Sequence, residues 1–428
     1  MNVTRIIQKK RDGEALAPGE ISAVIEGYVS GAVPGYQAAA LAMAIYFQGM
    51  DESETSALTR VLMESGECLD WTGVEGLRVD KHSTGGQGDK VSLVLAPLAT
   101  CCGLRVPMVA GRGLGPTGGT IDKLESIPGF RTDLGAADIR RITDEVGCVI
   151  SSQGDQFAPA DGKLYALRDV TATVASVPLI TASIMSKKLA EGLDALVLDI
   201  KWGSGAFMKD LDSAQSLGAA MAAVGEGMGV RTSCLVTDMN QPLGRAVGNA
   251  NEVREALAAL SGEGPADLME VVYELGALML TSAGQSEGKA AARATLEEEL
   301  ASGRPLEKFR EMARAQGGDA EADLELAPAR EVRASRAGYV SAIDGEALGY
   351  ALIALGGGRR SLEDTVDPSV GLQMRVRLGD AVEQGQPLLD LLSNGRGEEE
   401  AIELIEAGVT ITDKPLSRLP KLICAQAF

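Results

Sequence analysis

The chain has 428 residues and a formal net charge of −20, so its acidic surface repels nucleic-acid backbones and anionic lipid surfaces. We therefore expect neither nucleic acid nor a membrane as a partner. Hydrophobic residues make up 45% of the sequence and aromatic residues 4%, a mixture that favours helices packed on a parallel sheet. At about 150 residues per domain, the length predicts two or three domains.

The N-terminal segment, residues 1–65, predicts a helical domain. Residues 20–33 and 36–50 repeat apolar side chains at intervals of three and four, and Pro34-Gly35 separates the two stretches. The first residues contain no apolar signal-peptide region, and the longest apolar stretch is shorter than the ~18 residues that span a membrane. We expect a cytoplasmic protein.

After Trp71 the pattern changes to short β-branched runs that alternate with helical stretches. This alternation is typical of an α/β domain, which we assign to residues 66–159 and 193–330. Residues 160–192 look helical again and are assigned to the N-terminal helical domain. A Gly, Ala, Asp and Pro-rich linker follows near residue 316, and residues 331–428 predict a C-terminal α+β domain.

The stretch KHSTGGQGDK, residues 81–90, joins a predicted strand to a predicted helix. Glycines at a helix N-terminus present free N–H groups to an anion, and Lys81, Ser83, Thr84 and Ser92 add donors. The stretch does not fit the GxxxxGK[ST] phosphate loop. The alternative is a plain strand-to-helix connection with solvated lysines, and we favour anion binding because Lys, Ser and Thr are interleaved with the glycines.

A second glycine loop follows the predicted strand VPMVA, within residues 106–130. Its residues 113–118 match GxGxxG, which taken alone predicts a dinucleotide-dependent oxidoreductase. Pro128-Gly129 ends the following helix after two turns at most, so a full βαβ unit is missing. We interpret the loop, with Thr117 and Thr120, as the second wall of one phosphate site.

The third candidate lies in residues 159–192. Ser183 and Lys187 are four residues apart and share a helix face, and Arg168 lies on an earlier helical stretch. Together they can hydrogen-bond the carbonyls and the N–H of a planar heterocycle, although arginines and lysines on helices are more often solvated than functional. His82 is the only histidine, and it follows a strand among polar loop residues, where catalytic groups concentrate.

Taken together, these segments resemble the pyrimidine nucleoside phosphorylase family, which includes thymidine phosphorylase. The resemblance rests on DKHSTGGQGDKVSLVLAP, AGRGLGPTGGTIDKLESIPGF, the stretch from APADGKLYALRD to KWGSGAFM, and TDMNQPLGRAVGNANEVREAL. It implies a discontinuous helical dimerisation domain, a large α/β domain with a mixed sheet, and a C-terminal α+β domain. It also implies a homodimer whose active-site cleft closes by a hinge movement.

The resemblance implies phosphorolysis of pyrimidine nucleosides to a free base and a sugar 1-phosphate, without a metal or organic cofactor. The catalytic residues it implies are His82, Arg168 and Lys187. The same three residues and Ser183 hold the base. The implied phosphate-binding residues are Lys81, Ser83, Gly85, Gly86, Ser92 and Thr120.

Several positions depart from the family's pattern. Ala110 removes a hydroxyl that contacts phosphate in relatives, Pro116 replaces a histidine, and Gln87 replaces a small apolar residue. These departures leave a non-catalytic nucleoside-binding protein as a further alternative. Met108 stands where ribose-accepting relatives often carry a lysine, so thymidine is expected to be preferred over uridine; broad uridine and thymidine activity remains open.

One more departure concerns a cation site. Some relatives bind a monovalent cation near the hinge, at positions that match Gly88, Leu243, Ala246 and Glu255. This chain has Lys90 where those relatives have a hydroxyl residue, and a lysine ammonium is itself a compact positive charge. We therefore predict that Lys90 replaces the cation.

Overall fold

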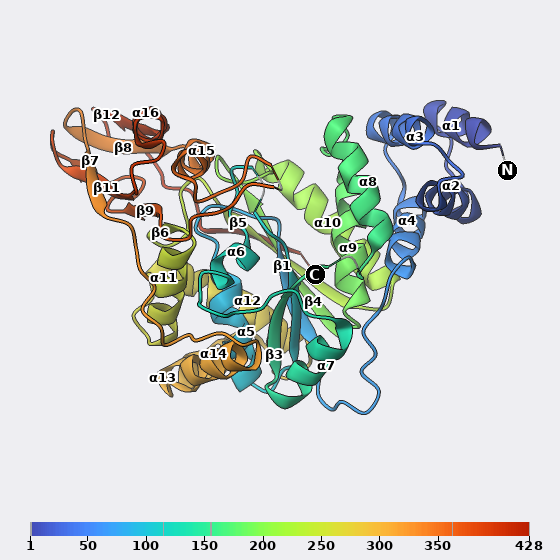
Figure 1. The fold of residues 1–428 in the computed structure, drawn as a ribbon, viewed down its shortest axis with the longest axis horizontal. Coiled ribbons are helices and arrows are strands. Elements are labelled where there is room, and N and C mark those ends of the chain that lie inside the picture. Colours follow the sequence, from blue (N-terminus) through green and yellow to red (C-terminus); the bar gives the residue numbers. More distant parts are fainter. Residues whose placement is uncertain (1, 114, 155, 362, 428) are drawn as a thin grey trace.

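The structure is a computed structural model that describes residues 2–113, 115–154, 156–361 and 363–427. The N-terminal helices and the C-terminal domain lie at opposite ends of a central α/β domain (Figure 1). The expected fold class is confirmed. Among the described residues, none of the helices combines the length and the apolar character that crossing a membrane requires.

The helical domain is built from two separate parts of the chain. Asp51 caps the fourth helix by accepting from the Glu54 backbone N–H, and Pro18 begins the second helix at a position that needs no N–H donor. Residues 159–190 return to this domain, as Leu164 and Leu179 share its core. Its helices are α1 (Val3–Arg11), α2 (Pro18–Ser30), α3 (Gly35–Gln48), α4 (Glu52–Glu64), α8 (Pro159–Val170) and α9 (Val177–Ala190).

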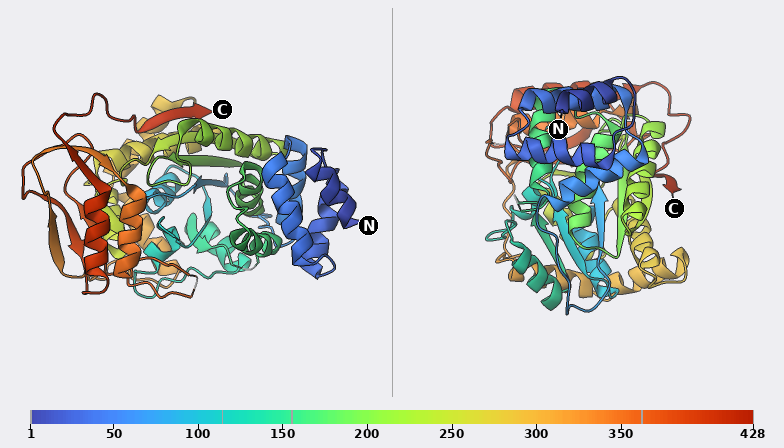
Figure 2. Two further views of the ribbon diagram at one scale, coloured as in Figure 1. Left: turned by 90° about the horizontal axis from the view of Figure 1, so that it is seen from above. Right: turned by 90° about the vertical axis from the view of Figure 1, so that its right-hand side faces the viewer.

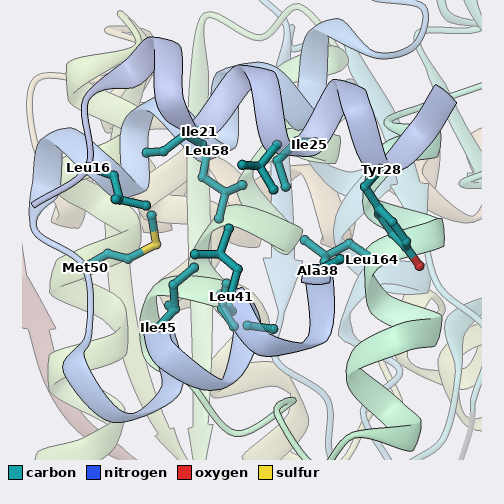
Figure 3. A pocket seen from close by; sticks show the side chains of 13 residues that line it. Leu16, Ile21, Ile25, Tyr28, Ala38, Leu41, Ile45, Met50, Leu58 and Leu164 are labelled. Carbon is teal, nitrogen blue, oxygen red and sulfur yellow. The ribbon is translucent and has the colours of Figure 1, made fainter. Parts of the chain in front are cut away.

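An apolar pocket lies inside this domain, between the N-terminal helices and the returning segment. Figure 3 shows Leu41, Ile45 and Leu58 pointing into it, with Leu164 of α8 at its border. Every lining residue is hydrophobic apart from the hydroxyl of Tyr28. We interpret it as a packing space of the helical core, because it presents no charged group to a ligand.

The α/β domain contains a parallel sheet with an antiparallel edge. β1, β4 and β5 pair in parallel, β13 joins β5 antiparallel, and β2 and β3 form a parallel pair beside β1. Val79 and Leu95 belong to its core cluster and are fully buried. Its strands are β1 (Val79–Ser83), β2 (Val106–Ala110), β3 (Cys148–Ser152), β4 (Ala195–Trp202), β5 (Arg231–Asp238) and β13 (Ile423–Ala427).

Helices cover both faces of this sheet (Figure 2). They are α5 (Val91–Cys101), α6 (Thr120–Leu124), α7 (Ala136–Glu145), α10 (Leu211–Gly227), α11 (Ala250–Leu260), α12 (Ala266–Ser282), α13 (Lys289–Ala301) and α14 (Arg304–Ala315).

The C-terminal domain packs two helices against two small sheets around its own core. The predicted helix in EALGYALIAL is present, and Asp344 caps it by accepting from two backbone N–H groups. The elements are β7 (Ala329–Arg333), β8 (Gly338–Ile343), α15 (Gly345–Leu355), β9 (Gly371–Met374), β10 (Ala381–Val382), β11 (Pro387–Leu392), α16 (Glu398–Gly408) and β12 (Val409–Thr412).

The α/β and C-terminal domains exchange strands. β6 (Ala246–Gly248), which comes from the α/β segment, pairs with β9 in a C-terminal sheet. In return, β13 leaves the C-terminal segment and pairs with β5 of the α/β sheet. Strands therefore cross the boundary expected near residue 331 in both directions, and Val247 and Ala327, which precede it, belong to the buried cluster of the C-terminal domain.

Candidate active site

The connection from β1 to α5 forms a glycine loop whose shape requires glycine. Gly85 and Gly88 have φ angles of 91° and 70°, in the left-handed region. A Cβ atom on Gly88 would lie 2.4 Å from the Leu243 carbonyl oxygen. The loop therefore lies directly against residues 243–246, which follow β5.

Lys81 lies at the base of this loop with its ammonium group buried. Its Nζ atom is 3.8 Å from Asp89 Oδ1 and 3.7 Å from Asp199 Oδ2, and its side chain has an exposed fraction of 0%. Among the described residues, this Nζ has no hydrogen-bond partner. Lys201 instead donates to Asp199 at 2.6 Å. A buried ammonium with unused donors is costly unless an anion completes it.

Asp89 organises the charges below the loop. Burial alone would raise the pKa of its carboxyl, but Lys201, Lys81 and the Ser83 hydroxyl hold that pKa well below its ordinary value. Ser83 Oγ donates to Asp89 Oδ2 at 2.6 Å. Lys123 Nζ donates to the Asp89 carbonyl at 3.2 Å. Lys81 and Lys201 therefore lie near the Asp89 carboxylate, and Lys123 binds its backbone carbonyl, next to the carboxyl end of β1.

The second glycine loop lies beside the first. A Cβ atom on Gly85 would lie 3.8 Å from Thr117 Oγ1. Thr120 begins α6, which has only 5 residues, so the context of a dinucleotide-binding βαβ unit is missing as expected. Leu114, within the GxGxxG match, lies outside the described residues. Ser92 lies buried in the first turn of α5.

Two of the departures from the family's pattern contact each other. The Gln87 side chain is buried, and its Nε2 donates to the Pro116 carbonyl oxygen. A Cβ atom on Gly349 of α15 would clash with both residues. Gln87 therefore joins the two glycine loops below the C-terminal helix α15.

Arg359 ties the C-terminal domain to the second loop. Its carbonyl accepts from the Gly115 N–H at 3.1 Å, and its guanidinium donates to Asp122 Oδ1 at 2.5 Å. Asp122 Oδ2 in turn accepts from the Gly113 N–H at 2.7 Å. Hydrogen bonds to Arg359 and to Asp122 therefore fix the loop that precedes Thr120.

Ser183 and Lys187 meet at one carboxylate on the neighbouring helix α8. Ser183 Oγ donates to Asp161 Oδ2 at 2.9 Å, and Lys187 Nζ lies 2.7 Å from the same oxygen. Asp161 is fully buried, and its Oδ1 has no hydrogen-bond partner among the described residues. Asp161 was not among the residues expected at the site. It stands seven residues before Arg168, two helical turns away on the same face of α8, and this spacing is the signal that points to it.

Arg168 lies close to this pair, but its guanidinium is already engaged. It donates to the backbone carbonyls of Thr173, Val174 and Leu179 at 3.4, 2.9 and 3.1 Å. The residue is 1% exposed, and burial lowers the pKa of the guanidinium. In this structure Arg168 fixes the turn between α8 and α9.

His82 follows Lys81 on β1 and is half-buried. Burial, together with the charges of Lys188, Lys81 and Lys187, holds the pKa of its imidazole well below 6.5. Lys187 belongs to the expected base-binding set and lies near enough to His82 for its charge to lower that pKa. His82 is neutral near pH 7 and has one N–H to donate.

Lys90 occupies the position predicted for it. Its Nζ donates to the carbonyls of Leu243 at 2.9 Å and Ala246 at 3.1 Å, and it pairs with Glu255. Its side-chain exposed fraction is 0%. The ammonium thus satisfies all three donors on the segment that packs against Gly88.

Three family models match consecutive parts of the chain. Residues 4–66 match the helical bundle domain of a glycosyl transferase family, and residues 75–306 match the a/b domain of that family. Residues 339–412 match the pyrimidine nucleoside phosphorylase C-terminal domain.

Individual relatives agree with these matches. Pyrimidine-nucleoside phosphorylases of Staphylococcus aureus strains MSSA476 and USA300 are each 46% identical over 433 residues, which is 99% of this chain and 99% of theirs. The structure also resembles anthranilate phosphoribosyltransferase from Thermus thermophilus. That likeness has a TM-score of 0.59 at 21% identity and covers 74% of this chain and 99% of the other, so it bears on the fold alone.

Proposed function

Because the chain belongs to the pyrimidine nucleoside phosphorylase family, we propose that it cleaves pyrimidine nucleosides with inorganic phosphate. The products are the free base and a pentose 1-phosphate. The observation that carries this proposal is Lys81, a buried ammonium at the end of β1 whose donors find no partner in the described chain. Phosphate supplies the acceptors that it lacks.

The phosphate is held, in this proposal, by Lys81, Ser83, Ser92 and Thr120 and by the N–H groups near Gly85 and Gly86. The first four come from β1, the first turn of α5 and the start of α6. Ser83 already donates to Asp89, so its hydroxyl also offers a lone pair to a protonated phosphate oxygen.

The base is held by His82, Arg168, Ser183 and Lys187. Breaking the glycosidic bond places negative charge on the departing base, and Lys187 and Arg168 supply positive charge where it develops. His82, neutral because of its lowered pKa, donates a hydrogen bond to a base oxygen. Phosphate attacks the sugar carbon, so the chemistry requires neither a metal nor an organic cofactor.

Arg168 can take this role without giving up its present partners. Its guanidinium has five N–H donors, and three of them donate to the carbonyls of Thr173 and Val174 in the α8–α9 turn and of Leu179 in α9. The unused donors face the substrate once the helical domain closes over the α/β domain. Closure also removes water, which suppresses hydrolysis of the nucleoside.

Thymidine is the preferred substrate in this proposal, because Met108 carries no donor for a 2′-hydroxyl. Met108 is 1% exposed in β2 and packs in the α/β core. A lysine at that position can reach a ribose only by extending from the core toward the carboxyl end of β2. Met108→Lys is therefore expected to raise uridine efficiency relative to deoxyuridine, and an unchanged ratio contradicts this assignment.

The protein works as a cytoplasmic homodimer in this proposal. Support comes from α3, where Tyr36 and Phe47 are 76% and 75% exposed, and from Tyr46, which stacks edge-on against Phe47. Large exposed aromatic side chains on one helix favour a protein interface.

Product analysis tests the proposal. Thymidine, deoxyuridine and uridine are incubated with the protein in phosphate buffer and in a phosphate-free buffer, and free base and pentose 1-phosphate are quantified. The expected result is base release only with phosphate, in equal amount to the sugar phosphate. Equilibrium nucleoside binding without turnover supports a non-catalytic binding protein instead, and an absorbance change with NAD supports an oxidoreductase.

A further inference from the structure

A buried cluster of one lysine and two carboxyl groups lies behind the base half of the site. Lys188 Nζ donates to Asp80, to Glu191 Oε1 at 2.8 Å and to the Val109 carbonyl at 2.6 Å. The exposed fractions of the three side chains are 3%, 0% and 0%. None of these residues belongs to the phosphate-binding or base-binding sets above.

The cluster holds two carboxyl groups against one ammonium, and each carboxyl has one oxygen unaccounted for. Asp80 Oδ1 and Glu191 Oε2 are both buried without a partner among the described residues. Lys188 Nζ donates to one oxygen of each carboxyl group, so both groups lie against the same ammonium. Burial raises the pKa of the Glu191 carboxyl well above its ordinary value, and the charge of Asp80 raises it further, although Lys188 lowers it. Two ionised carboxylates on one buried ammonium repel each other, whereas one proton on the pair removes that repulsion.

The cluster also joins the elements that carry the two halves of the site. Lys188 follows Lys187 on α9, the helix that presents Ser183. Asp80 precedes Lys81 on β1, and Val109 belongs to β2. Lys188 thus connects the base-binding helix directly to the strand that carries Lys81 and His82.

We propose that Lys188, Asp80 and Glu191 form a positioning cluster that holds one proton between its two carboxyl groups and fixes α9 to β1. Glu191 keeps the proton and its O–H donates a hydrogen bond to the Asp80 carboxylate, whose charge Lys188 balances. The positioning role rests on the proposed phosphorolysis, whereas the location of the proton does not depend on it.

His82 makes the proton measurable, because it is the only histidine in the chain and its imidazole signal in an NMR titration is unambiguous. Lys188 and Lys187 on α9, Lys81 on β1 and Asp89 in the following loop are the charged groups that face it. Burial and the three lysines lower the pKa of His82, and Asp89 raises it. A change of charge in the cluster therefore shifts the titration of His82.

The titration is carried out on the full-length protein without a histidine tag, as wild type, Glu191→Gln and Lys188→Met. Glu191→Gln keeps the shape and the donor of a protonated acid, so it is expected to leave the pKa of His82 unchanged. A further lowering of that pKa contradicts the proposal, since it means that a negative charge was removed. Lys188→Met is expected to raise the pKa of His82, and an unchanged value contradicts the proposed link.

Thermal unfolding supplies a second measure of the proton that remains usable if Lys188→Met does not fold. The raised pKa of Glu191 means that the folded wild type binds a proton that the unfolded chain releases above about pH 4.5. Its melting temperature is therefore expected to fall, relative to Glu191→Gln, as the pH is raised from about 5 to about 8. Parallel curves contradict a protonated Glu191.

Kinetics test the positioning role. Lys188→Met is expected to raise the KM for nucleoside and the KM for phosphate together, because it loosens the base-binding helix α9 from the strand β1 that carries Lys81. The expected loss in kcat/KM is about 10- to 100-fold. Glu191→Gln is expected to keep kcat/KM within about twofold. A merely structural role lowers the folded fraction and hence kcat with both KM values unchanged, and that result contradicts positioning. If neither the wild type nor any variant shows turnover, the proposed function is wrong. The His82 titration still tests whether Glu191 carries the proton.

Discussion

Lys81 and Lys90 stand at the two ends of one glycine loop, and both ammonium groups are fully buried. Lys90 donates to two carbonyls and pairs with Glu255, whereas Lys81 has carboxylates only at 3.7 and 3.8 Å and no hydrogen bond among the described residues. Burial alone therefore does not reveal a lysine's role. The number of satisfied donors separates a structural cation from one that awaits an anion.

The largest effect is expected for Lys90→Met, which removes the lysine whose hydrogen-bond donors are all satisfied. Removing one partner of a buried pair leaves Glu255 uncompensated and costs about 3–5 kcal/mol of stability. Chemical denaturation of wild type and variant measures the difference. Lys81→Met is the matched control, and equal losses of stability in the two variants break the distinction.

His82→Ala tests the neighbour of Lys81 and carries a smaller expected effect. Losing one neutral hydrogen bond to the base costs about 0.5–1.5 kcal/mol, so turnover is expected to fall up to about tenfold with the KM for phosphate unchanged. A KM for phosphate that rises in parallel places His82 in the phosphate half instead.

The pH dependence of His82 has a definite sign. Its pKa is lowered on folding, so its neutral form is favoured and contributes stability above its unfolded pKa of about 6.5. That contribution is lost as the pH falls toward the lowered folded pKa. Wild-type turnover is expected to show no His82 titration from about pH 6.5 to about pH 8, and an inflection in that range that His82→Ala abolishes contradicts this assignment.

Potassium is expected to have the smallest effect of all, because Lys90 already supplies the charge next to Leu243 and Ala246. Wild-type activity in sodium, potassium and tetramethylammonium buffers of equal ionic strength should agree. Lys90→Thr should create a potassium requirement. Severalfold activation of the wild type by potassium contradicts the replacement.

The order of helices and strands could be predicted from periodicity, because each element leaves its own local pattern. The run VSLVLAPLATC reads as a helix and forms α5. β13 could not be predicted in this way, because its five residues pair with β5, which lies nearly half the chain away. Strand pairing of that kind is decided by tertiary packing.

The candidate site, too, could be predicted only in part. Glycines, lysines and hydroxyls in residues 81–90 predicted an anion loop, and Lys81 is buried there without a partner among the described residues. The role of Arg168 at the base stays a prediction, and in this structure its guanidinium donates to the carbonyls of Val174, in the α8–α9 turn, and Leu179, in α9. The sequence could not distinguish these roles, since an arginine on a helix has the same spacing whether it binds a ligand or a turn. Asp161 was missed because its seven-residue spacing from Arg168 becomes a signal only when the whole face of α8 is considered.

Binding of inorganic phosphate to wild type and to Lys81→Met, measured by calorimetry without nucleoside, tests whether the unpartnered Lys81 ammonium binds the anion. A buried charge-assisted contact is worth about 1.5–3 kcal/mol, so the variant is expected to bind phosphate about 10- to 100-fold more weakly while it remains folded. Equal phosphate affinity in the two folded proteins would show that the unpartnered ammonium of Lys81 is not the anion site.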